Sequence, residues 1–327
     1  MKSELSKFGR RMRFYAVNFA SYAVPRCWFR WRKVSVLSSL SDQERQEAEQ
    51  RARYYCQMDT IGGKHEITGT DALTVGEFKY PWGQKHKFVT YFFDLYNVLK
   101  YFPIHLRFYR IFGDVNYVPN MPAFVKSRPI AHTPANGIIL KLNQVRHFHF
   151  VHDKKCFADK QDRMVSRNFL SPNQPQRVLL MEHCFGSSLC DVGQINDTPY
   201  TGHPEWTVPY MSTEQMLDYK FIACIEGNDV ATNLKWVMSS NSVAVMPRPK
   251  FETWFMEGTL RPDYHYIEVA DDYHDVEEKL LHYIHHPEEA EEIVRHAHQY
   301  IEQFTNKRLE RATQLLTAQR YFENTNT

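Results

Sequence analysis

The turn Glu226-Gly227-Asn228-Asp229 is where residue types first indicate ligand binding. It follows the apolar run 221–225 and precedes a segment of helical composition, so a strand is expected to pass here to a helix N-terminus. Unpaired backbone N–H groups and the helix dipole at such an end can hold a diphosphate, and Gly227 lets the backbone approach closely. Asp229 also fits the role of helix N-cap, and Lys235 either supports an anion or extends over apolar surface.

Three further cations are candidates for contact with phosphate. Arg167 follows a charged stretch, whereas Lys126 and Arg128 stand in a loop before the next predicted strands. A departing nucleotide diphosphate gains negative charge, which arginines can stabilise without a metal ion. Taken singly, each of the three is equally well explained as surface charge.

Asp114 is the candidate acidic residue. Residues 105–115 alternate in the manner of a strand that ends at Gly113 and Asp114. This pattern places the carboxylate at a strand end facing a cleft, although an aspartate there is also a common turn residue.

The elements that position these residues are clearest in the C-terminal third. Residues 221–225 predict a strand, 229–238 a helix and 243–246 the next strand, which together form a βαβ unit of a parallel sheet. Residues 287–322 predict helix, with Pro287 at the first helical position. The apolar stripe of this helical region comprises Ile293, Ala297, Tyr300, Ile301 and Phe304.

Earlier elements are less regular. Residues 39–56 predict a helix capped by Ser41, and residues 86–102 predict a buried helix or a helix followed by a strand. Residues 137–151 predict one or two strands, and the apolar patch 178–181 predicts a strand followed by loops.

Three histidines raise a metal-binding alternative. On the predicted strand, His147 and His149 share one face and His152 points to the other. No acidic or thiolate ligand set lies nearby, so we interpret them as polar strand positions and expect no metal site.

Residues 1–35 form a basic, aromatic arm. The arm contains the single acid Glu4, and tryptophan, tyrosine and phenylalanine are interleaved with its charged residues. Its nine cations are Lys2, Lys7, Arg10, Arg11, Arg13, Arg26, Arg30, Arg32 and Lys33. This mixture suits docking on anionic lipid headgroups. The alternative is a basic helix that packs on the protein's own body; nucleic-acid binding is disfavoured because no known motif for it is present.

Length and composition limit the class of protein. A chain of 327 residues with 43% hydrophobic residues fits two α/β domains, each with its own core. The six cysteines include no CxxC pair and follow no secretory signal, so a reducing compartment is expected. No window reaches about 18 consecutive apolar residues, so no helix is expected to cross a bilayer.

The run from Tyr219 to Gly258, continuing through PDYHYIEVADDY, resembles the C-terminal lobe of the family-90 glycosyltransferases. The similarity covers strand, glycine turn, helix and strand in one order, and a weaker likeness reaches back to about residue 114. That family includes bacterial lipopolysaccharide-modifying transferases and animal protein O-glucosyltransferases.

The resemblance implies an α/β fold of GT-B type, with two Rossmann-like lobes, a cleft between them and the donor held mainly by the C-terminal lobe. It also implies inversion at the anomeric carbon, with Asp114 matching the carboxylate that serves as base. Arg167 matches an arginine that contacts the donor, although Asn168 replaces the glycine that follows it in the family. Gly227 and Lys235 match family positions, and Glu226 replaces an arginine, so it is expected to accept from ribose or sugar hydroxyls.

These observations predict a cytoplasmic glycosyltransferase at the inner face of the cytoplasmic membrane, moving a sugar from a UDP-sugar to a lipopolysaccharide or related glycan. No cofactor or metal is expected. The predicted divisions are residues 1–35 for the docking arm, 36–160 for the acceptor-side lobe and 161–327 for the nucleotide-sugar lobe. The alternative is a catalytically silent, membrane-associated glycan-binding protein of the same fold.

Overall fold

The computed structural model describes residues 2–58, 67, 71–82, 87–130 and 136–326. The chain forms two compact units. Unit 1 comprises residues 1–146, 251–255 and 304–327, and unit 2 comprises residues 147–250 and 256–303. The last helix therefore belongs to unit 1, whereas the sequence prediction assigned it to the C-terminal lobe.

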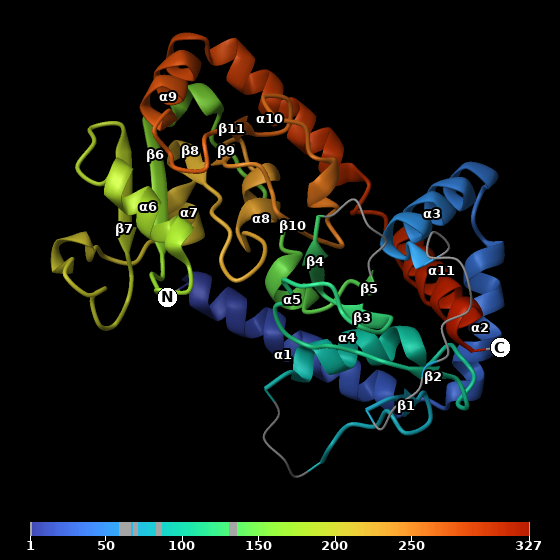
Figure 1. The fold of residues 1–327 in the computed structure, drawn as a ribbon. Helices are drawn as coiled ribbons and strands as arrows, with labels where there is room; N and C mark the ends of the chain where they lie inside the picture. The colour runs from blue at the N-terminus through green and yellow to red at the C-terminus, as the bar shows by residue number, and fades with distance from the viewer. Residues whose placement is uncertain (1, 59–66, 68–70, 83–86, 131–135, 327) are drawn as a thin grey trace. The chain divides into compact units, whose positions relative to one another are not determined.

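Unit 2 is built on a five-stranded parallel sheet with the order β11-β9-β8-β6-β7 (Figure 1). The strands are β6 (Gln161–Asn168), β7 (Cys190–Gln194), β8 (Tyr219–Ala223), β9 (Val243–Met246) and β11 (Ile267–Glu268). From β6 the chain first adds β7 on one side and then places β8 on the other side. The direction of strand addition therefore reverses between β6 and β8. The predicted α/β class and parallel βαβ unit are confirmed in unit 2.

The helices of unit 2 connect and flank these strands. They are α6 (Pro175–Cys184), α7 (Thr213–Met216), α8 (Leu234–Met238), α9 (Val276–His285) and α10 (Pro287–Glu302), with short 3-10 turns at Phe157–Asp159, Pro204–Trp206 and Glu257–Thr259. The prediction of a strand at 178–181 is wrong, because these residues lie inside α6. Four apolar residues fit either element, and Pro175 at the first helical turn favours the helix.

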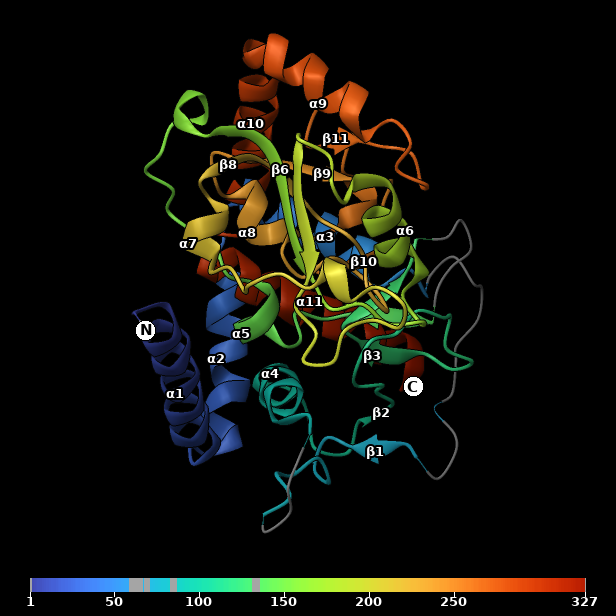
Figure 2. The same ribbon diagram turned by 90° about the vertical axis from the view of Figure 1, so that its left-hand side faces the viewer.

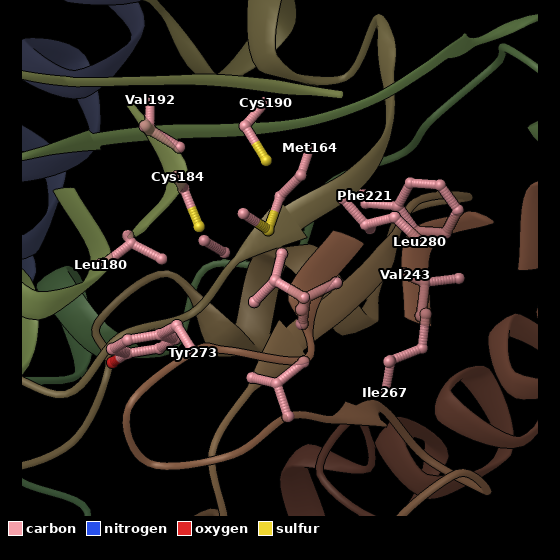
Figure 3. Packing of buried hydrophobic residues seen from close by; sticks show 14 of the residues in the cluster. Met164, Leu180, Cys184, Cys190, Val192, Phe221, Val243, Ile267, Tyr273 and Leu280 are labelled. Carbon is pink, nitrogen blue, oxygen red and sulfur yellow. The ribbon is translucent and has the colours of Figure 1, made fainter. Parts of the chain in front are cut away.

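The core of unit 2 forms where the strands meet these helices (Figure 3). Met164, Phe221 and Val243 from three neighbouring strands are buried, and Leu180 of α6 and Leu280 of α9 belong to the same cluster. On α10 the predicted apolar stripe is present, since Ile293, Ala297 and Ile301 are all buried. This packing fixes the sheet whose strand ends carry the candidate site.

Unit 1 is mainly helical. Its helices are α1 (Lys2–Tyr22), α2 (Arg26–Ser38), α3 (Asp42–Tyr55), α4 (Val89–Leu99) and α11 (Lys307–Thr325), and α5 (Gln144–His147) ends at its boundary with unit 2. As predicted, Ser41 caps α3, and the structure shows that it does so in a capping box with Glu44. Residues 89–99 form helix α4, and residues 100–102, where a strand was the alternative, lie in a turn.

Among the described residues of unit 1, six short strands pair. β1 (Leu73–Thr74) pairs with β2 (Arg107–Phe108), and β4 (Ser127–Pro129) pairs with β10 (Phe251–Thr253), both antiparallel. β3 (Ala123–Val125) pairs in parallel with β5 (Gly137–Ile139). The strand predicted over 105–115 is thus confined to β2 and an isolated bridge at Arg110.

The strand predicted to carry His147 and His149 is wrong. β5 ends at Ile139, Asn143 adopts a positive φ of 55°, and α5 then begins at Gln144. Asp94 of α4 accepts hydrogen bonds from the Gln144 backbone N–H at 3.0 Å and from its side chain at 2.8 Å. This carboxylate satisfies a donor at the start of the helix, which explains why the chain turns there.

The basic arm packs on unit 1, as the alternative interpretation required. Phe14 and Phe19 of α1 contact the ring of Phe93 in α4 edge to face, with centroids 6.4 and 4.8 Å away. Arg26 of α2 donates a hydrogen bond to the Val75 carbonyl at 2.6 Å. In the described part of the chain, no helix combines the length and apolar content needed to cross a membrane.

Candidate functional site

The carboxyl ends of β6 and β8 form the candidate ligand site of unit 2. In open α/β sheets, ligands bind outside the carboxyl ends of strands at the point where strand order reverses. Here that point lies between Asn168, the last residue of β6, and Ala223, the last residue of β8. Phe169 directly after β6 is 56% exposed, so this edge offers an aromatic surface to a ligand.

Arg177 lies between these two strand ends. It occupies the first turn of α6, the helix that follows β6. Its guanidinium donates to the Phe169 carbonyl at 3.1 Å and to the Glu226 carbonyl at 3.3 Å. A half-buried guanidinium beside a helix N-terminus is suited to an anionic ligand, because its charge and the helix dipole act in the same direction.

The sequence prediction did not include Arg177, because it interpreted residues 172–209 as a strand followed by loops. The signal that could have revealed it is Pro175, since a proline at a first helical position after a polar loop predicts a helix there. An arginine in the first turn of such a helix then becomes a candidate for anion binding.

The turn after β8 is fixed by α6. Gln176 donates its side-chain amide to the carbonyls of Glu226 at 2.9 Å and Gly227 at 2.8 Å, and Gln174 donates to the Asn228 side chain at 3.2 Å. A Cβ at Gly227 would lie 2.8 Å from the Arg177 guanidinium. An added Cβ would therefore require the flexible end of Arg177 to shift, and the group that approaches Gly227 in this structure is Arg177.

The helix expected directly after this turn begins later than predicted. α8 starts at Leu234 with Asn233 at its N-cap position, so Asp229 is not a helix cap. Asp229 is buried, and its carbonyl accepts from the Gly227 N–H at 2.9 Å. Residues 226–229 thus form a compact loop, and the helix N-terminus next to them is that of α6.

Two more cations follow β9 at the same edge of the sheet. Arg248 lies 3.4 Å from the Glu268 carboxylate and Lys250 lies 3.0 Å from the Asp271 carboxylate. The Lys250 backbone N–H donates to the Glu226 carboxylate at 3.1 Å. Both cationic side chains are largely exposed. The sequence signal was the Pro-Arg-Pro-Lys segment that directly follows the predicted strand.

Arg167 of β6 is directed toward the neighbouring strand β7. Its side chain pairs with Asp191 at 2.7 Å and also donates to the Pro209 carbonyl at 3.1 Å. Burial favours the neutral form of Asp191, but the hydrogen bond from Tyr219 and the pairing with Arg167 outweigh it and lower the pKa of Asp191. In this structure Arg167 therefore links two strands of the sheet.

Lys235 lies in the interior of unit 2. Its ammonium pairs with the Glu257 carboxylate, and the two side chains are 0% and 1% exposed. Removing either partner would break a buried ion pair, which costs stability. This placement explains why the helix carries a lysine at this position.

In unit 1, Asp114 lies beside a buried lysine. Gly113 adopts a φ of 108°, a conformation that favours glycine and turns the chain immediately before Asp114. Lys126, whose side chain is 3% exposed, contacts the Asp114 carboxylate at 2.6 Å, whereas the Asp114 side chain is 39% exposed. Ser127 also exchanges hydrogen bonds with the backbone of Val115. The carboxylate is thus held in position while open to solvent.

Arg128 has a different environment. Its guanidinium bonds to the Glu252 carboxylate at 2.8 Å and to the carbonyls of Tyr54, Tyr55 and Gly137 at 2.8 to 3.2 Å. Only 1% of the side chain is exposed. Arg128 therefore connects α3, β5 and β10 within unit 1 and does not face solvent.

A parallel α/β sheet with cations gathered at its switch point is typical of enzymes that bind nucleotides. A model of Glycosyl transferase family 90 matches residues 197–312, which include β8, the 226–229 turn and β9. The chain is also 43% identical over 237 residues to the O-glucosyltransferase LpsA of Dichelobacter nodosus, covering 71% of this chain and 72% of that relative. The chain belongs to glycosyltransferase family 90, which confirms the resemblance noted in the sequence.

Proposed function

We propose that this glycosyltransferase moves glucose from UDP-glucose onto a saccharide of lipopolysaccharide or a related surface glycan. The observation that carries the choice of sugar is the similarity to a relative named as an O-glucosyltransferase. The saccharide acceptor follows from the lipopolysaccharide-modifying members of the family. The nucleotide donor is supported by the three cations at the carboxyl edge of the parallel sheet, Arg177, Arg248 and Lys250.

The proposed reaction is an inverting displacement in a GT-B arrangement, with unit 1 on the acceptor side and unit 2 on the donor side. Asp114 takes the proton of the acceptor hydroxyl while the oxygen attacks the anomeric carbon. The bond from that carbon to UDP breaks on the opposite face. Arg177 and the N–H groups at the start of α6 stabilise the negative charge that the diphosphate gains, so no metal ion is needed.

The other candidate residues divide into two groups. Glu226, Gly227 and Asn228 form the donor-side loop, in which Glu226 accepts hydrogen bonds from ribose or sugar hydroxyls. Lys126 positions Asp114, while Arg167, Lys235 and Arg128 hold strands and helices in place through their ion pairs. We place the protein at the inner face of the cytoplasmic membrane, where lipid-linked acceptors are made.

The donor class is tested by ligand stabilisation of the folded chain. We expect UDP and UDP-glucose to raise the melting temperature, and GDP and CMP to do so much less, because only a ligand that binds the folded state stabilises it. The shift should be the same with EDTA. A requirement for Mg²⁺ or Mn²⁺ in binding and turnover would contradict the metal-independent mechanism, and an equal response to all nucleotides would contradict the choice of donor.

Arg177→Gln is expected to weaken UDP binding by about 10- to 100-fold, the range for losing a hydrogen bond to a charged group. Isothermal titration calorimetry gives this affinity directly. Arg295→Gln is the matched control, because Arg295 is exposed on α10, where it pairs with Glu292 of the same helix. Arg167→Ala should lower the melting temperature, whereas its UDP affinity should change little. Unchanged UDP affinity in Arg177→Gln would move the donor site away from this strand edge.

A further inference from the structure

A hollow of about 610 Å³ lies in unit 1, bordered by α1, α2, the residues after α4 and the start of α11. Its size is in the range of small-molecule sites. Of the described residues that line it, none is acidic and five are cations, namely Arg32, Lys100, Lys307, Arg308 and Arg311. A second hollow of about 340 Å³ shares Trp28, Arg32 and Arg308 with it and continues along α2. We call the two together the α2 pocket.

The charge of the α2 pocket is only partly compensated. Arg308 pairs with the Glu44 carboxylate, and Arg311 donates to the Asn97 carbonyl at 2.9 Å. Lys100 is 4% exposed and donates to the neutral side chain of Asn97 at 2.7 Å. Burial, and then the charge of Arg311, lower the pKa of Lys100 to about 7. An anion in the pocket would offset the repulsion between these positive charges.

The remaining walls are aromatic and apolar. The Arg32 guanidinium lies 4.7 Å from the centroid of the Trp28 ring, which is itself 42% exposed. On the same helix Trp31 and Val34 are 72% and 70% exposed. Exposed tryptophan beside lysine and arginine is the composition of protein surfaces at the membrane interface, where rings lie at headgroup level and cations contact phosphates.

We infer that the α2 pocket holds the phosphate headgroup of an anionic membrane lipid while Trp31 and Val34 enter the interfacial layer. This inference deepens the proposed membrane location and rests on it. The pocket is larger than one phosphate requires, and the exposed apolar side chains beside it favour a lipid over a soluble anion. A second copy of the same face would bring like charges together, which disfavours a dimer as the occupant.

The first test is sedimentation of the full chain with vesicles of phosphatidylcholine alone or with one third phosphatidylglycerol. We expect binding only to the anionic vesicles. The double variant Arg32→Gln/Lys307→Gln should bind them about tenfold more weakly or worse, since each cation at an anionic surface contributes roughly a few-fold to affinity. Point variants are used because removing residues 1–35 would expose Phe93, which α1 covers.

Arg11→Gln/Arg30→Gln is the matched control, because these two arginines are exposed on the same arm and do not line the pocket. It removes the same charge and should lose less than about threefold in binding. Equal loss in both double variants would overturn the pocket as a specific site. We expect both double variants to keep the melting temperature and UDP affinity of the wild type. A loss of vesicle binding can then be distinguished from failure of the proposed glycosyl transfer.

The second test identifies the source of the phosphate. Phosphatidylglycerol with brominated acyl chains should quench the tryptophan fluorescence of the bound protein, and Trp28→Phe/Trp31→Phe should abolish most of that quenching. Soluble glycerol 3-phosphate should bind weakly in calorimetry without vesicles. Tight binding of the soluble phosphate, vesicle binding without quenching, or a dimer dissociated by Trp31→Ala in sedimentation velocity would each overturn the inference.

Discussion

Asp114→Asn is expected to lower the turnover of glycosyl transfer by about 10²- to 10⁴-fold, the usual contribution of acid–base catalysis. The amide keeps nearly the shape of the carboxylate but cannot take the proton of the acceptor hydroxyl. UDP affinity should hardly change, since the proposed donor site uses residues of unit 2. Turnover with a truncated glycan acceptor and UDP affinity by calorimetry separate the two effects.

The neighbouring lysine requires a control for folding. Lys126 is buried and loses its ion-pair partner in Asp114→Asn, which by itself costs stability. The double variant Asp114→Asn/Lys126→Gln also removes the positive charge that faced Asp114 and should not regain turnover, whatever its melting temperature. Asp71→Asn, an exposed aspartate of the same unit, should be close to wild type in both measurements.

The stereochemistry of the product tests the same assignment independently. A single displacement assisted by Asp114 gives a product whose anomeric configuration is opposite to that of the donor, which NMR of the purified product reads directly. Near-normal turnover of Asp114→Asn in a well-folded protein would require another base. Retention of configuration would exclude the single displacement altogether.

The fold was predictable where residues form long periodic patterns and less so elsewhere. Ser41 and Glu44 signalled the start of α3, and Pro287 with its acidic neighbours signalled α10. The patch 178–181 and the segment around His147 were misassigned, because a few apolar residues fit either element and tertiary contacts then decide. At α5 that contact is the Asp94 carboxylate, which lies 50 residues away along the sequence.

The position of the candidate turn at a strand end was predictable from the sequence. The ion-pair partners of the candidate cations were not. The Glu226 to Asp229 turn could be placed after a strand from composition alone, and it is found there. Whether a cation faces ligand or interior depends on partners distant in sequence, which no local pattern shows. Arg128 and Lys235 were candidates for contact with anions of the substrate, and both are buried against carboxylates of the protein itself. Pro175 could have indicated that Arg177 lies in a first helical turn, but its position beside the ends of β6 and β8 is known only from the structure.

Glu310→Gln is expected to destabilise unit 1 by about 3 to 5 kcal/mol, the cost of breaking a buried ion pair by removing one partner. Glu310 of α11 is 5% exposed. Its carboxylate contacts Arg51 of α3 at 2.5 Å, Lys141 after β5 at 2.6 Å and the Trp254 indole N–H at 2.9 Å. Glutamine keeps the shape but removes the negative charge that faces Arg51 and Lys141.

Because the chain has two units, the loss of stability in Glu310→Gln is best located by hydrogen exchange. Peptides from α3 and α11 report the opening of unit 1 separately. Glu323→Gln on the same helix is the control, since Glu323 is exposed and should change stability by less than about 0.5 kcal/mol. Adding Lys141→Met to Glu310→Gln removes one of the two buried cations that lose their contact with Glu310, so the double variant should be more stable than the single one. A single variant within about 1 kcal/mol of wild type would contradict the stabilising role assigned to the Glu310 carboxylate.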